Sequence, residues 1–166
     1  MRNFLAVMLL VGFAGQAEAA VEAKIAYVDV GKAFDEYQKT KDADSTLEKK
    51  GQSKQDEREK KVDTIKKLKD ELALLSEDAR KKRQADLDQS LKDLQDFDSR
   101  VRDELRRERD SIVRDILKEI DEIISDYGNK QGYSLILNDR VLLYGRQDMD
   151  ITSQIIQILN ERYKKK

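Results

Sequence analysis

A long charged stretch, from about Lys39 to Lys130, carries apolar residues at helical spacing. Its second half contains Leu87, Leu91, Leu94, Val101, Leu105, Ile112 and Ile116. Steps of three, four or seven residues place such side chains in one narrow stripe along a helix. The stretch has no Pro and, before its end, a single Gly at position 51. A helical pattern well beyond ~25 residues without caps is typical of a coiled coil, so the pattern predicts a helical rod.

One break in this rod is predicted at Ser76-Glu77-Asp78. Ser is a good N-cap, and two acidic residues in the next turn favour a helix start. Two helices joined by so short a connection run antiparallel, so the rod is expected to be a helical hairpin. Its first arm, from Lys32 to Leu75, would be ~65 Å long at ~1.5 Å per residue. The returning arm is expected to end at Lys130, closed by Gly128 and Gly132.

The first arm lacks an apolar stripe over part of its length. Residues 48–61 contain no aliphatic or aromatic residue, and the stripe then resumes with Val62, Ile65, Leu68, Leu72 and Leu75. We expect the polar part to be a solvated helix supported by pairs such as Glu57 with Lys61. Gly51 lies within it and costs about 1 kcal/mol relative to Ala. It is either a tolerated defect on an exposed helix or a flexible point that lets the rod bend.

Patterns typical of β-strands flank the rod. Lys24–Val30, which is rich in β-branched and aromatic residues and ends at Gly31, predicts one strand. Tyr133–Leu137 and Val141–Tyr144 predict two more. The turn residues Asn138-Asp139-Arg140 between them predict that these two strands form a β-hairpin.

The last predicted element is a short amphipathic helix over Ile151–Leu159, preceded by acidic residues that favour a helix start. The chain then ends in Arg162, Lys164, Lys165 and Lys166. We expect these cations to form a solvated end that complements the helix C-terminus. A weak contact with an anionic membrane surface or lipopolysaccharide is the alternative.

The strands and the terminal helix predict an α+β fold, in which residues 20–31 and 131–166 form a small β-rich body. Residues 32–130 form a long antiparallel helical hairpin inserted in it. So small a body without a disulfide has a poor core, and its strand edges would be exposed. We therefore expect an obligate homo-oligomer. Candidates for the shared core are Ile25, Tyr27, Val28, Leu135, Leu137, Leu142, Tyr144, Ile151, Ile155 and Leu159.

The N-terminal residues 1–19 have the pattern of a secretory signal peptide. Arg2 gives a positive start, Phe4–Ala14 is an uncharged apolar run, and Ala17-Glu18-Ala19 is a small-x-small cleavage site. The mature chain is expected to begin at Ala20 and, in a bacterium, to lie in the periplasm. A retained membrane anchor is the alternative, but the run is well short of the ~20 residues that span a bilayer.

The composition excludes several classes of function. Charged residues make up 40% of the chain and aromatic residues 6%, which suits a rod better than a large globular core. The chain has no Cys and no His, which removes thiol chemistry, imidazole acid–base chemistry and the usual zinc ligands. With 33 basic and 34 acidic residues, no overall field attracts nucleic acid. We expect no enzymatic activity, no cofactor, no metal site and no nucleic-acid partner.

The chain resembles the Skp/OmpH family of periplasmic chaperones over nearly all of its mature length. The start matches in Ile25-Ala26-Tyr27-Val28-Asp29 with the following Phe34. The end matches in Tyr133–Leu137, in Val141–Tyr144, and in Asp150-Ile151-Thr152 leading into Ile155 and Leu159. The order of these segments on either side of a Pro-free charged hairpin, behind a signal peptide, is the specific part of the resemblance.

The resemblance implies a homotrimer with a small β-barrel body, in which the candidate core residues would form the trimer core. Three helical-hairpin tentacles would enclose a cavity that holds unfolded outer-membrane β-barrel proteins without ATP. Candidates for client contact on the returning arm are Leu87, Leu91, Leu94 and Phe97; the alternative is that they form the contact between the two arms. The best-known members are strongly basic, whereas this chain is slightly acidic, so lipopolysaccharide binding is not carried over.

A structural coiled-coil spacer of the cell envelope is the alternative function. Such a spacer would keep its helices bundled and would need a continuous apolar stripe. The polar gap at residues 48–61 argues against this reading and favours a flexible chaperone arm.

Overall fold

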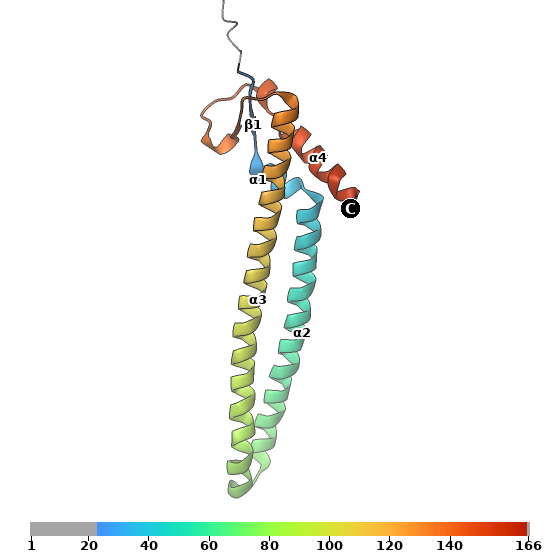
Figure 1. The fold of residues 1–166 in the computed structure, drawn as a ribbon. Helices are drawn as coiled ribbons and strands as arrows, with labels where there is room; N and C mark the ends of the chain where they lie inside the picture. The colour runs from blue at the N-terminus through green and yellow to red at the C-terminus, as the bar shows by residue number, and fades with distance from the viewer. Residues whose placement is uncertain (1–22, 166) are drawn as a thin grey trace, which may run out of the picture.

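Two long helices form a hairpin, and short elements from both ends of the chain form a body at its root (Figure 1). The computed structural model describes residues 23–165, so the predicted signal peptide lies outside the described residues. The elements are β1 (Ile25–Val28), α1 (Val30–Glu36), α2 (Gln38–Leu74), α3 (Glu77–Gln131), β2 (Leu135–Asn138), the 3₁₀ turns η1 (Asp139–Val141) and η2 (Gln147–Met149), and α4 (Thr152–Lys164).

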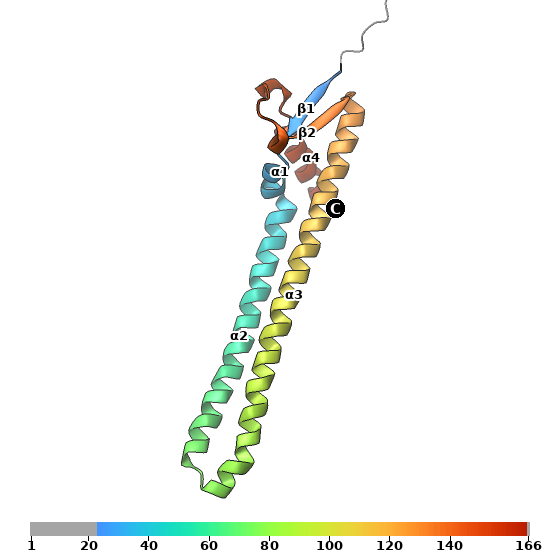
Figure 2. The ribbon, with the colours of Figure 1, turned by 90° about the vertical axis from the view of Figure 1, so that its left-hand side faces the viewer.

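The predicted helical hairpin is confirmed: α2 and α3 run side by side for the whole length of the arm (Figure 2). α2 ends at Leu74, and Ser76 is the N-cap residue of α3. The Nε of Arg80, in the first turns of α3, donates a hydrogen bond to the Leu72 carbonyl at 3.1 Å. The Leu72 carbonyl also accepts from the Leu75 amide at 3.4 Å, so two donors pair with it at the end of α2.

The chain is interrupted at Tyr37, between α1 and α2, so the prediction of a first arm that is helical from Lys32 is wrong, whereas the single break within Lys39–Lys130 is confirmed. Tyr37 has extended backbone angles, and its side chain is fully buried. Its ring packs edge-on against Tyr163 of α4, with the ring centroids 5.9 Å apart. Burial of this aromatic ring fixes the local bend, which helical spacing of apolar residues does not reveal.

The two strands come from opposite ends of the chain and pair in parallel. The register runs from Ile25 opposite Leu135 to Val28 opposite Asn138. Parallel strands need a long crossover connection, and here the whole helical hairpin is that crossover. A single bridge between Tyr27 and Asp150 lies on the other edge of β1.

The predicted β-hairpin of Tyr133–Leu137 with Val141–Tyr144 is not formed within this chain. β2 leads into the 3₁₀ turn η1, where Asn138 Oδ1 accepts a hydrogen bond from the Arg140 amide at 3.2 Å. An Asn side chain that caps its own backbone in this way starts a helical turn rather than a two-residue hairpin. The residues that follow, up to Arg146, form an irregular segment.

The first strand is also shorter than predicted, because α1 begins at Val30 and includes Gly31. Asp29 is the cap: its Oδ1 accepts a hydrogen bond from the Lys32 amide at 2.7 Å. An Asp side chain that pairs with an otherwise orphan amide stabilises the start of a helix. The β-branched Val30 therefore lies in a helix despite its strand propensity.

The main core lies in the body, between β1, α1, the end of α3 and α4. Its fully or nearly fully buried residues are Ala26, Val28, Ala33, Tyr37, Ile116, Ile120, Ile123, Ile151, Ile155 and Leu159. Two glycines of α3 allow this packing. A Cβ at Gly128 would lie 3.0 Å from Ile136 Cδ1, so the strand approaches the helix closely there. Gly132 ends α3 in the left-handed region, at φ 70°.

Replacing Ile155 with Ala is expected to lower the free energy of unfolding by about 2–5 kcal/mol, because it leaves a cavity in this core. Leu74, which is 88% exposed at the end of α2, gives the matched control. Leu74→Ala should change stability by less than about 0.5 kcal/mol. Urea unfolding followed by circular dichroism measures both, and equal effects would show that the core is misplaced.

Candidate functional site

The outer face of the small sheet exposes apolar side chains. Alternation along a strand sends neighbouring side chains to opposite faces, and Ala26 and Val28 of β1 point into the core. Ile25 and Leu135, which are opposite each other in the register, are 38% and 48% exposed. Tyr27 is half-buried on the same face.

The irregular segment after η1 extends this apolar face. Val141, Leu143 and Tyr144 are 70%, 106% and 83% exposed. Leu142 and Tyr144 line a shallow depression together with Ile25, Tyr27 and Leu137. We call this set of apolar residues the body surface: Ile25, Tyr27, Leu135, Leu137, Val141, Leu142, Leu143 and Tyr144. Large exposed apolar patches on a small body are typical of interfaces with other proteins.

The ten residues predicted for a shared core fall into two groups. Ile25, Tyr27, Leu135, Leu137, Leu142 and Tyr144 belong to the body surface. Val28, Ile151, Ile155 and Leu159 are buried within the chain itself, at 2% exposure or less. The second group therefore stabilises the single chain rather than facing another one.

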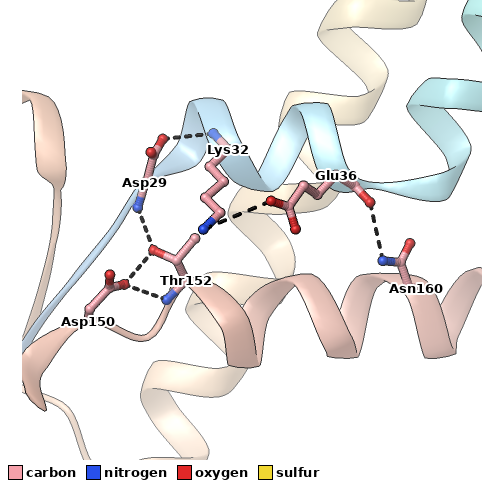
Figure 3. Close-up of polar contacts among 6 residues, drawn as sticks. All are labelled: Asp29, Lys32, Glu36, Asp150, Thr152 and Asn160. Carbon is pink, nitrogen blue, oxygen red and sulfur yellow. Dashed lines mark hydrogen bonds and ion pairs between the residues drawn. The ribbon is translucent and has the colours of Figure 1, made fainter. Parts of the chain in front are cut away.

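A hydrogen-bond network joins the two ends of the chain behind this surface (Figure 3). The Asp29 amide donates to Thr152 Oγ1 at 2.9 Å. Thr152 in turn donates its hydroxyl and its amide to Asp150 Oδ1, at 2.5 and 2.8 Å. The Asp150-Ile151-Thr152 motif thus caps α4 and ties it to the start of α1.

The root of the arm is held by Asn160 of α4, which spans the break at Tyr37. Asn160 Oδ1 accepts a hydrogen bond from the Gln38 amide at 2.7 Å. Its Nδ2 donates to the Glu36 carbonyl at 3.3 Å (Figure 3). Tyr163 adds a hydrogen bond from its hydroxyl to Asp42 at 3.0 Å. The direction in which α2 leaves the body is therefore set by the terminal helix.

An ion pair closes the root between the two arms. Lys39 Nζ of α2 lies 2.6 Å from Glu119 Oε2 of α3, and the Glu119 side chain is almost fully buried. Burial, together with the nearby Glu119 carboxylate, raises the pKa of Tyr37 to about 12.

The four client-contact candidates lie mostly between the arms rather than on an outer face. Leu87 is 7% exposed and packs with Ile65 and Leu72 of α2 in a small cluster near the tip, against which Leu94 also packs. Phe97 is 8% exposed.

In the middle of the arms Lys61 Nζ lies 5.4 Å from the ring centroid of Phe97, a cation–π distance. Leu91 differs from the other three candidates because it is 41% exposed, so it alone of the four is clearly accessible to a partner.

Ion pairs, not apolar contacts, join the arms at mid-length. Lys50 Nζ of α2 lies 2.7 Å from Glu104 and 2.5 Å from Glu108 of α3. Arg58 pairs with Asp98 at 3.0 Å. The polar stretch of α2 is helical and has no buried residue, as predicted for a solvated helix, and two of its cations, Lys50 and Arg58, also pair with the opposite arm.

These pairs are partly exposed, so their energies are small and sensitive to salt. The hydrogen bonds and charges of Glu104 and Glu108 raise the pKa of Lys50. The hydrogen bond and charge of Lys50 lower the pKa of Glu104.

Among residues 23–165, no cluster of three or more carboxylates could hold a metal ion. Within that same range, no helix is long and apolar enough to cross a membrane.

A match with a family model shows to which protein family the chain belongs. The model described as outer membrane protein (OmpH-like) matches residues 24–159, which is most of the chain. The chain belongs to the OmpH family. OmpH proteins are periplasmic chaperones rather than enzymes, in agreement with the prediction that this chain carries no enzymatic activity.

Among solved structures, an OmpH-like outer membrane chaperone candidate from Caulobacter crescentus CB15 matches with a TM-score of 0.78. The match covers 84% of this chain and 85% of that one at 17% sequence identity, and it shows that the two share a fold. No curated protein matches the chain.

The sequence did not reveal two sets of residues: those that hold the root of the arm, and the most exposed residues of the body surface. Asn160 and Tyr163 lie where a solvated cationic end was expected, and a polar residue on a helix gives no signal of a distant partner. Val141 and Leu143 were not singled out, because four apolar residues in a row show no alternation.

Acidification should loosen the middle of the arm in this OmpH protein. The lowered pKa of Glu104 in the folded state means that its contribution is present above its ordinary pKa of about 4.3. The contribution is lost as the pH falls through the lowered value. NMR titration of Glu104 checks this. The pKa should lie below the ordinary value in the wild type and rise toward it in Lys50→Met. An unchanged pKa in Lys50→Met would contradict the pairing.

Proposed function

We propose that this protein is an ATP-independent holdase that binds unfolded outer-membrane β-barrel proteins in the periplasm and prevents their aggregation. The observation that carries the proposal is the hairpin, with arms of 37 and 55 residues joined by a thin contact. A holdase needs a large and adjustable surface rather than a catalytic site. Membership of a chaperone family supports an unfolded protein as the partner.

The same proposal includes a homotrimer assembled through the body surface. Val141, Leu143 and Tyr144 would be costly to leave in water at ~25 cal/mol per Å² of apolar area. Strand addition from a neighbouring chain would also pair the edge of β2 that faces away from β1. Three hairpins leaving one shared body would enclose the cavity that holds the client.

Export from the cytoplasm through cleavage of residues 1–19 belongs to the proposal, since a periplasmic chaperone must cross the inner membrane. A weak electrostatic contact of the cationic chain end, which includes Arg162 and Lys164, with an anionic membrane surface is a further part of it. Such a contact would strengthen the association of the protein with the membrane surface only at low ionic strength.

The holdase proposal is tested by light scattering of an unfolded β-barrel membrane protein diluted from urea. The purified mature protein should suppress aggregation without ATP, and native mass spectrometry should show one trimer per client. A protein that leaves aggregation unchanged would rule out the holdase function. A client-bound monomer would rule out only the trimer.

The body surface is tested separately by Leu143→Asp. The variant should dissociate the trimer, because a carboxylate buried in an apolar interface has no partner. Leu74→Asp, at an equally exposed apolar position on the arm, should leave the trimer intact. Sedimentation velocity measures both, and a stable Leu143→Asp trimer would show that assembly uses another surface.

A further inference from the structure

The apolar stripe of α3 has no apolar partner on α2 in the middle of the arm. Phe97, Val101 and Leu105 of α3 line a groove whose other wall includes Gly51, Lys54 and Arg58 of α2. The groove has a volume of about 410 Å³ and is open to solvent. Residues 48–61 of α2 supply no aliphatic or aromatic side chain to fill it. We call this space the mid-arm groove.

Gly51 keeps the groove open. The residue is half-buried, yet a Cβ added there would have no heavy atom of another residue within 4 Å. A larger side chain at this position would therefore extend into open space, at a groove that Val101 and Leu105 also line. Gly51 therefore lines the groove without filling any of it.

Ion pairs limit the groove along the arm. Arg58–Asp98 is part of the lining toward the tip, and Lys50–Glu104 lies on the body side of the groove. The space between them admits a few side chains. A whole helix, which is ~10 Å across, would require the pairs to break.

The charge of the lining differs in sign from the charge of the chain. Lys54, Arg58 and Arg102 are cationic, and Asp98 is the one carboxylate in the lining, which leaves the lining a net charge of +2. Arg58 pairs with Asp98, and Lys54 pairs with Glu57 outside the lining at 3.0 Å, so acidic groups of a ligand would meet Arg102 and compete for the other two cations. The whole chain has a net charge of −1. A ligand with acidic groups beside its apolar side chains would complement such a groove.

We propose that the mid-arm groove is a docking site for an extended segment of a client chain in which apolar and acidic residues alternate. In an extended chain, every second side chain points the same way. The apolar side chains would pack on Val101 and Leu105 beside Gly51, while the acidic ones meet Lys54, Arg58 and Arg102. This site rests on the proposed holdase function, since the client is the source of the segment.

Filling the groove tests the site. Gly51→Leu should place an apolar side chain on Val101 and Leu105, and it should weaken the binding of a short peptide that alternates Val and Glu by about tenfold. Gly51→Ala is the matched control, since it restores helix propensity without filling the space. It should bind within about twofold of the wild type. Fluorescence anisotropy of the labelled peptide measures the binding.

Other outcomes separate the competing explanations. Equal binding by Gly51→Leu, in a variant that circular dichroism shows to be folded, would overturn the site. Equal binding of a Val/Lys peptide would overturn the charge argument. If the wild type suppresses client aggregation but binds neither peptide, the site fails and the holdase function stands. If the wild type does not suppress aggregation, the holdase function fails first.

A direct readout uses the absence of natural Cys. Gly51→Cys, labelled with a polarity-sensitive dye, should shift its emission on addition of the Val/Glu peptide, whereas Lys69→Cys on the exposed face of α2 should not. A shift that depends on protein concentration alone, without peptide, would mean that a second copy of the chain occupies the groove, and would overturn the proposal.

Discussion

The pairing of the two chain ends is the interaction on which the rest of the structure depends. β1 and β2 lie side by side only because the whole hairpin returns the chain to its start. Closing so long a connection carries an entropic cost that grows slowly with its length. The body core offsets this cost with Ile116, Ile120 and Ile155, and Thr152 joins the ends through its hydrogen bonds.

Contacts between the arms change in kind from root to tip. The root is closed by buried apolar packing and by the Lys39–Glu119 pair. The middle relies on partly exposed ion pairs around Gly51, and the tip is closed by the small cluster that includes Ile65 and Leu87. Proteins open locally where buried apolar contacts are few. The middle of the arm is therefore the part that can separate while both ends stay closed.

Such a gradient suits a protein that must hold chains of different size. Exposed salt bridges contribute little and can exchange partners with a bound chain. The groove beside Gly51 then supplies apolar contact without a continuous apolar face that would make the arms stick to each other. The body stays fixed because Asn160 and Tyr163 hold the base of α2.

The long helices and their antiparallel arrangement could be predicted from the sequence, because helical spacing over many residues is a strong and local signal. The break at Tyr37 and the 3₁₀ turn after Asn138 could not. The break at Tyr37 depends on partners more than a hundred residues away, in α4. The turn after Asn138 depends on a choice between two local hydrogen-bond patterns.

In the candidate site, too, the sequence predicts some features and leaves others open. Four of the apolar residues predicted for a shared core, among them Ile155, are buried within the chain, whereas Tyr144 is exposed. Sequence does not say whether such a residue faces its own chain or another one. The cross-arm partner of Lys50 was equally hidden, since a charged residue on a helix has solvent as its default surroundings.

Hydrogen exchange along the arms of the intact protein, with and without an unfolded β-barrel client, tests the central claim most directly. Without client, amides of residues 48–61 should exchange faster than those of β1, of α4 and of the tip cluster around Ile65. With client bound, protection should rise first in that stretch and opposite it around Val101. Uniform protection along the arms, or client protection confined to the body, would contradict this account.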